Sequence, residues 1–244
     1  MARMLVPRAA LVLALASALA LALAGLGYRW GWWGLATSFS VLRAAGFAAA
    51  GVALLALVGV ALTALARAWP GLTLAVVALA IAGVVVWVPL SLQKLARAVP
   101  SIHDITTDTE NPPAFVAVAE RRRDAPNPAA YDGPEVAAQQ KRGYPDLGPL
   151  MLAAPPDRVL AAAEATARAM GWETVAVAPG EGRLEATATT SWFAFKDDVV
   201  VRVSPAGAGS RVDVRSKSRV GRSDLGTNAK RIRAFLAGLA TRAG

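Results

Sequence analysis

The distribution of carboxylates is the feature that most restricts the fold. The first 99 residues carry seven of the 26 Lys and Arg residues and none of the 17 Asp and Glu residues. Three uncharged apolar stretches lie in this part, at residues 9–28, 44–66 and 68–93. A helix of about 20 apolar residues crosses about 30 Å of hydrocarbon, where backbone polar groups must be bonded internally. The sequence therefore predicts a transmembrane region over residues 1–99, with three helical spans at about 9–28, 44–66 and 70–92.

The first apolar stretch allows a second interpretation. Arg3 and Arg8 precede a short Leu/Ala core, and the segment Ala22–Ala24 resembles a signal-peptidase site. Either interpretation, a cleaved signal before two spans or three spans with an inside N-terminus, places the C-terminal part outside. The basic residues flanking the spans are nearly balanced between the two sides, so the basic start of the first helix decides the orientation. We expect an integral protein of a bacterial inner membrane with a periplasmic C-terminal domain.

The link between the first two spans is aromatic. It contains Tyr28, Trp30, Trp32 and Trp33 beside Arg29. Amphipathic rings next to a basic residue are typical of the headgroup layer, so we interpret them as an interfacial belt and the lipid bilayer as a partner. A sugar-binding or quinone-binding role of these rings is the alternative.

Net charge and composition exclude several classes of function. The net charge of +9 arises mainly in the membrane region, because residues 100–244 hold 19 bases and 17 acids. It is therefore not the signature of a nucleic-acid-binding protein. The chain has no Cys and one His, which excludes disulfide frameworks, Cys–His zinc sites and a Cys nucleophile. No motif for a cofactor or a metal is present, so neither is expected.

Two regions follow the predicted spans. Residues 100–156 are rich in Pro, Asp and Asn, and we expect an irregular extended connector packed on the domain, with a short helix at 135–142. Residues 157–244 read as a helix, four alternating strands and a final helix. The expected strands lie at 172–178, 184–192, 199–203 and 211–219, with a turn at 195–198. The predicted domain is an α+β sandwich in which a four-stranded antiparallel sheet carries both helices on one face.

A basic segment near the C-terminus is the strongest candidate for ligand binding. Residues 211–233 hold eight bases and two acids in a strand, a turn and the start of a helix. Forked Arg donors and a helix N-terminus attract anions. The predicted ligand-binding residues are Arg215, Ser216, Ser218, Arg219, Ser223, Asp224, Asn228 and Arg231. Alternatively, Ser223, Asp224 or Thr227 only caps the helix. The arginines then pair with Asp197, Asp198 or Asp213, or face water.

A second candidate lies at the start of the connector. His103, Asp104 and Asp108 combine an imidazole with two carboxylates, which is the composition of an acid–base or metal site. We rate them as weak catalytic candidates, because a lone His in a turn more often makes an ordinary hydrogen bond and no nucleophile motif accompanies it.

Several of these motifs resemble the family known as domain of unknown function 1499. The resemblance rests on residues 103–108 with Asn111-Pro112-Pro113, on Tyr144-Pro145, on residues 189–199 and on residues 215–228. Ala194 stands where the family has Gly. The resemblance covers about residues 100–240, and the membrane region is similar to that of bacterial members in general character. It implies no activity.

The sequence supports three hypotheses about function. The favoured one is a non-enzymatic cell-envelope protein whose external domain binds an anionic ligand, a lipid headgroup or an envelope protein. The second is a membrane-tethered hydrolase that uses His103, Asp104 and Asp108. The third is an accessory subunit of a membrane complex, because Gly46, Ala50, Gly51 and Gly59 permit close helix packing. Whether the protein is an enzyme, and its oligomeric state, stay open.

Overall fold

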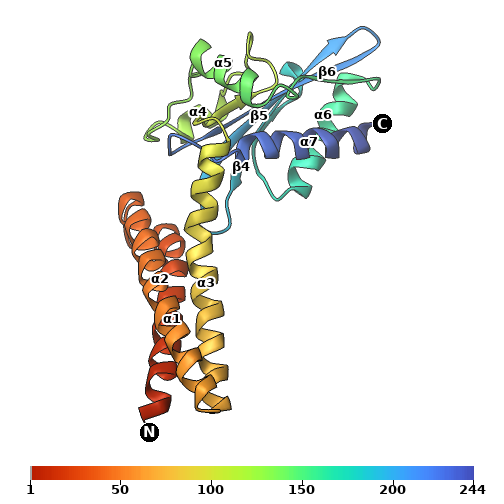
Figure 1. Ribbon diagram of the computed structural model, residues 1–244. Helices are drawn as coiled ribbons and strands as arrows, with labels where there is room; N and C mark the ends of the chain where they lie inside the picture. Colours follow the sequence, from red (N-terminus) through yellow and green to blue (C-terminus); the bar gives the residue numbers. More distant parts are fainter. Residues whose placement is uncertain (1) are drawn as a thin grey trace. The chain divides into compact units, whose positions relative to one another are not determined.

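The computed structural model describes residues 2–244, which form two compact units. One unit comprises the described residues up to 95 with residues 192–194, and the other comprises residues 96–191 and 195–244. Figure 1 shows the helices of the first unit in red to yellow and the sheet and helices of the second in green to blue. Each unit is described by itself.

The first unit consists of three long apolar helices. They are α1 (Ala2–Arg29), α2 (Leu35–Leu65) and α3 (Trp69–Ala98), and all three are long and apolar enough to cross a membrane. The helices extend beyond the predicted spans, since α2 includes Arg43 and α3 continues to Ala98, and Pro89 lies within α3. Gly46 accommodates this proline, because a Cβ atom at Gly46 would lie 3.0 Å from Pro89 Cγ.

The second unit is an antiparallel sheet with helices. Its elements in chain order are β1 (Asp104–Thr106), α4 (Ala117–Arg121), α5 (Pro134–Gly143), β2 (Leu150–Leu152), α6 (Pro156–Ala169), β3 (Glu173–Ala178), β4 (Arg183–Thr189), β5 (Lys196–Ala206), β6 (Gly209–Ser218) and α7 (Thr227–Ala243). A short 3₁₀ turn, η1 (Pro179–Glu181), joins β3 to β4. The order in the sheet is β1-β6-β5-β4-β3, and β2 also pairs with β6.

The predicted α+β class is confirmed, but the sheet has six strands and not four. The additional strands β1 and β2 come from the segment expected to be irregular, and both pair with β6. The turn expected at residues 195–198 is also wrong. Lys196 pairs with Thr189, so the turn occupies residues 190–195 and Asp197 and Asp198 lie inside β5. The short helix expected at 135–142 is present as α5.

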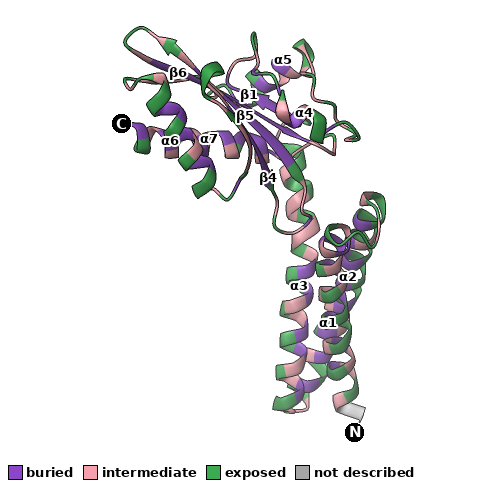
Figure 2. Cartoon of the chain, turned by 180° about the vertical axis from the view of Figure 1, so that it is seen from behind, coloured by how far each residue is buried: buried purple, intermediate pink, exposed green. Residues whose placement is uncertain are grey.

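The strands alternate between an apolar face and a polar face. Val199, Val201, Val212 and Val214 point into the main core, where α6 and α7 pack. Trp172 and Phe235 stack in this core with their ring centroids 5.1 Å apart. Figure 1 shows α6 and α7 on one side of the sheet and α4 and α5 on the other, and Figure 2 shows buried residues along the central strands. The segment 104–150 therefore covers the polar face.

Candidate functional site

The covered polar face of the sheet holds most of the charged candidate residues. Along β6, Asp213, Arg215 and Lys217 alternate with residues of the apolar face, and all three are buried. Antiparallel pairing places Asp104 of β1 opposite Lys217 and Thr106 opposite Arg215. The register therefore brings a carboxylate from the beginning of the domain next to the two buried bases of its last strand.

Arg215 and Asp104 form a buried forked ion pair. Arg215 Nε lies 2.8 Å from Asp104 Oδ1, and Nη2 lies 2.8 Å from Oδ2. The Arg215 guanidinium also donates to the Ala129 carbonyl at 3.0 Å and lies 4.7 Å from the centroid of the Phe115 ring. The side chains are 2% and 0% exposed, so this pair is saturated and shielded from solvent.

Lys217 extends the pair into a chain of charges. Its Nζ lies 3.2 Å from Asp104 Oδ2 and 2.5 Å from Asp132 Oδ1. Asp132 in turn lies 3.2 Å from His103 Nε2. Tyr131 packs beside this chain, and its buried hydroxyl makes no hydrogen bond among the described residues. Burial raises the pKa of Tyr131 to about 12, and the negative charge of Asp104 acts in the same direction.

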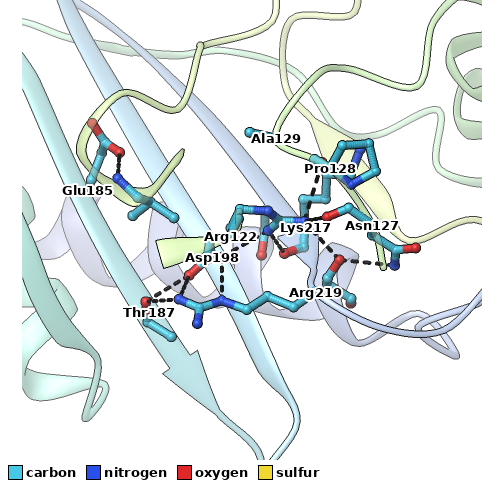
Figure 3. A network of polar contacts seen from close by, with 12 residues as sticks. Arg122, Asn127, Pro128, Ala129, Glu185, Thr187, Asp198, Lys217 and Arg219 are labelled. Atoms are coloured by element: carbon cyan, nitrogen blue, oxygen red, sulfur yellow. Dashed lines mark hydrogen bonds and ion pairs between the residues drawn. The ribbon is translucent and has the colours of Figure 1, made fainter. Parts of the chain in front are cut away.

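A second buried network centres on Asp198 of β5 (Figure 3). Arg219 donates to both Asp198 oxygens at 2.8 Å, and Thr187 donates to Oδ1 at 2.7 Å. Arg122, which follows α4, donates to Asp198 Oδ2 at 2.9 Å and to the Lys217 carbonyl at 3.0 Å. Burial lowers the pKa of Arg122, and Asp198 opposes that effect. This network fixes the segment after α4 onto the sheet.

Glu185 of β4 fixes the other end of α4. Its carboxylate accepts hydrogen bonds from the backbone N–H groups of Val116, Ala117 and Val118, at 3.1, 3.0 and 2.8 Å. These donors are the unpaired N–H groups at the start of the helix, where a carboxylate is favoured. Arg183 pairs with the same carboxylate.

Asp108 belongs to a third cluster. Its Oδ2 lies 3.0 Å from Nη2 of Arg202 and 3.0 Å from Nη2 of Arg211, and Asp213 pairs with the same two arginines. Burial alone would raise the pKa of Asp213, but hydrogen bonds from Arg211 and Arg202 lower it below its ordinary value. His103 and Asp104 both contact Asp132, whereas Asp108 pairs with Arg202 and Arg211, so the three weak catalytic candidates do not share one set of partners. Among residues 2–244, no group of three or more His, Asp or Glu side chains could hold a metal ion.

Four candidate residues meet on the opposite face of β6. Ser216 and Ser218 belong to β6, and Asn228 and Arg231 belong to α7. Ser216 Oγ donates to Asn228 Oδ1 at 2.7 Å, and Asn228 Nδ2 donates to Ser218 Oγ at 3.0 Å. Arg231 joins this cluster, because its Nη1 donates to Ser216 Oγ at 3.1 Å, and its Nη2 lies 2.6 Å from Asp197 Oδ2.

Ser223 and Asp224 lie at the turn before α7. Asp224 accepts the N–H groups of Gly226 and Asn228 at 2.8 Å each, and Ser223 Oγ accepts the Leu225 N–H at 3.3 Å. Burial raises the pKa of Asp224, and those backbone hydrogen bonds oppose the shift. The eight predicted ligand-binding residues are thus divided between two sheet faces and one helix cap.

Sequence reasoning missed Arg122, Asp132 and the pairing role of Asp104. One signal could have indicated them. Bases recur at every second position from Arg211 to Arg219, apart from Asp213, so one face of this strand needs carboxylates opposite it. The acids at positions 104, 108 and 132 lie together in the segment that was expected to pack on the domain.

An open hollow of about 400 Å³ lies at the edge of this polar face. Residues 107–110, the end of α5 and the turn at 144–149 line it together with Arg211. Lys141 lines it too and pairs at 2.6 Å with the exposed Glu110, which lowers the Glu110 pKa. Arg211 bonds to Asp213 and Asp108 through Nε and Nη2, and its Nη1 makes no hydrogen bond to any described residue. The Thr107 hydroxyl donates to Asp213 at 3.2 Å and accepts the Val214 N–H at 2.9 Å, so it is already engaged in the sheet, and the hollow offers hydrogen bonds and charge to a ligand.

These features define a class of protein, one with three apolar helices of membrane-spanning length and an α+β domain whose buried charges are paired internally. The chain belongs to the family described as "Protein of unknown function (DUF1499)", whose model matches residues 104–239, more than half of the chain. The matched region starts at Asp104 and contains the buried networks.

Solved structures that are similar to part of this chain include three of low sequence identity. Protein CV1439 from Chromobacterium violaceum is 16% identical with a TM-score of 0.30, and the match covers 39% of this chain and 95% of that chain. TTHA0849 from Thermus thermophilus is 15% identical with a TM-score of 0.26, covering 39% and 94%. Ara h 8.0201 is 13% identical with a TM-score of 0.23, covering 38% and 92%. No curated protein matches the chain.

Proposed function

We propose that the protein is a membrane-anchored cell-envelope binding module for a ligand that carries a carboxylate or a phosphate. The observation that carries this proposal is a contrast within the α+β domain. Arg215, Lys217 and Arg219 pair with buried carboxylates, whereas at the open hollow Arg211 pairs through Nε and Nη2 only and Lys141 pairs with an exposed carboxylate. Arg211 and Lys141 can therefore receive an anion without the opening of a buried ion pair.

Because the hollow is open, we expect the ligand to contact Arg211 and Lys141 rather than Arg215 or Arg219. Binding at Arg215 or Arg219 first requires separation from Asp104 or Asp198, which is costly for a buried pair. Lys141 needs to leave only the exposed Glu110. An exposed ion pair is weak, so an anionic ligand competes with it easily.

The hydrolase hypothesis has no support from the geometry, because Asp104 is already paired with Arg215 and Lys217, and Asp108 belongs to a different cluster from His103. The role as an accessory subunit stays a prediction. For localisation, we propose insertion in the inner membrane with the α+β domain outside, on the basis of Arg3 and Arg8 before the first apolar stretch. A reporter fused after Gly244 tests this: activity of a cytoplasmic reporter contradicts it.

Non-denaturing mass spectrometry of the purified full chain tests the binding function. We expect a retained anionic small molecule in the wild-type protein and at least tenfold less in Lys141→Gln, because one charge-assisted hydrogen bond contributes about 1.5–3 kcal/mol. Arg142→Gln is the matched control, since Arg142 is exposed and does not line the hollow. Equal retention by the three proteins, or no retained anion, contradicts the proposal.

A further inference from the structure

A groove of about 500 Å³ lies between α2 and α3 in the helical unit. It runs along α2 from Phe39 to Ala50 and along α3 from Val86 to Gln93. At 1.5 Å per residue, the α2 side of the groove is about 16 Å long, which is about half of a 30 Å hydrocarbon layer. The groove is therefore as long as the acyl region of one leaflet, and its volume lies within the usual range for ligand pockets.

Arg43 is the one charged residue that lines this groove. Among the described residues it makes one hydrogen bond, from Nη2 to Ser40 Oγ at 3.3 Å, and no ion pair. The helical unit contains no carboxylate, because residues 1–95 and 192–194 include no Asp or Glu. A guanidinium inside an apolar helix is costly without a partner, so its counter-ion must come from outside this unit.

The position of Arg43 fits the edge of the hydrocarbon layer. The α2 helix has 31 residues, so it is about 46 Å long and exceeds the hydrocarbon thickness at both ends. Arg43 lies seven residues, about 10 Å, from its middle. Side chains on a helix lean toward its N-terminus, and a long Arg side chain extends its charge toward the interface. If the middle of α2 lies at the bilayer midplane, the guanidinium reaches headgroup depth and the groove continues into the hydrocarbon.

We propose that the groove between α2 and α3 holds one anionic phospholipid, with its phosphate on Arg43 and an acyl chain along Gly46, Ala50 and Pro89. The argument from charge favours this occupant over a zwitterionic lipid or a helix of a second copy. A lipid of net negative charge supplies the missing counter-ion, whereas the headgroup cation of a zwitterionic lipid neutralises its own phosphate, and apart from Arg43 and Gln93 the lining of the groove is apolar. This inference depends on the proposed insertion in a membrane, but it does not depend on the hollow of the α+β domain.

Lipid binding is measured on the full chain reconstituted in nanodiscs of equal phosphatidylglycerol and phosphatidylcholine, followed by native mass spectrometry. We expect one retained phosphatidylglycerol on the wild-type protein and at least tenfold less on Arg43→Gln. Ala50→Leu, which fills the groove and keeps the charge, should reduce retention as well. Arg67→Gln is the matched control, because it removes the same charge from the exposed turn between α2 and α3. Unchanged circular dichroism and elution volume show that each variant is folded.

Three results overturn the inference: equal phosphatidylglycerol on the wild-type protein and Arg43→Gln, equal retention of both lipids by the wild-type protein, or a dimer without lipid. Alkali washing of vesicles separates this failure from a failure of membrane insertion. A chain that resists alkali but binds phosphatidylglycerol independently of Arg43 contradicts only the lipid site, whereas a chain that alkali releases contradicts insertion itself.

Discussion

The buried charge network makes the stability of the α+β domain sensitive to a single carboxylate. Asp104→Asn keeps the shape of the side chain and removes its charge. Arg215, at 2% exposure, then loses its only carboxylate partner among the described residues, although Lys217 retains Asp132. Removing one partner of a buried ion pair costs about 3–5 kcal/mol. We expect a loss near the lower end, about 3 kcal/mol, because the Ala129 carbonyl still accepts a hydrogen bond from Arg215 at 3.0 Å.

Hydrogen exchange of β6 amides in the detergent-solubilised full chain measures this loss. A decrease of about 3 kcal/mol in the free energy of opening accelerates exchange about a hundredfold. The matched control is Glu173→Gln, which breaks an ion pair with Arg121 at 2.6 Å whose side chains are 60% and 46% exposed. This exposed pair contributes less than about 1 kcal/mol.

A double variant checks that the buried charge is the cause. Arg215→Met in the Asp104→Asn background removes the uncompensated guanidinium, and exchange of β6 should slow again because an apolar side chain tolerates burial. The reasoning is refuted if Asp104→Asn and Glu173→Gln accelerate exchange equally, since burial would then make no difference to the energy of the pair.

Three further predictions concern backbone strain, pH and helix capping. Gly182→Ala should lower the free energy of unfolding by about 1–3 kcal/mol or more. Gly182 has a φ of 59°, and a Cβ atom added there would lie 2.1 Å from the Val203 carbonyl oxygen. Gly180→Ala, at an open position of the same turn, should change it by less than about 0.5 kcal/mol in the same urea titration. The pKa of Tyr131 is raised to about 12 in the folded state and is about 10 in the unfolded state. The unfolded state therefore loses the hydroxyl proton first, and the free energy of unfolding falls as the pH rises from about 10 to about 12. Tyr131→Phe should weaken this fall when unfolding at about pH 9 and about pH 11 is compared; an identical pH dependence would contradict the assignment. Asp224→Ala should lower the thermal unfolding midpoint through a loss of about 1 kcal/mol, and Asp224→Asn should restore most of it by keeping an acceptor for the Asn228 N–H.

Local patterns account for the parts of the fold that were predictable from sequence. The three apolar helices, the helix α6 and the strands β3 to β6 each show their own periodicity or composition. The strands β1 and β2 do not, because each has three residues. Asp104 meets Lys217 across more than a hundred residues of sequence, so nothing near Asp104 identifies it as part of a sheet.

Separation in sequence also limited the prediction of the candidate site. The alternative that the arginines pair with Asp197, Asp198 or Asp213 is confirmed for Arg231, Arg219 and Arg211. Asp213 is two residues from Arg211, and Asp197 and Asp198 lie on β5, the strand next to β6. The partners of Arg215 and Lys217 come from the segment 104–132, and only the register of β1 against β6 brings them together. The hollow beside Arg211 and Lys141 likewise depends on tertiary packing.

The central place of β6 has a consequence for biosynthesis. This strand ends at Ser218 and lies between β5 on one side and β1 and β2 on the other, so the earlier strands on that side have no neighbour until it has been made. A nascent chain emerging from the ribosome exposes Asp104 and Asp132 long before Lys217 is available to them. Completion of the sheet therefore has to follow translation of residue 218, and products of premature termination before that residue should be degraded by proteases.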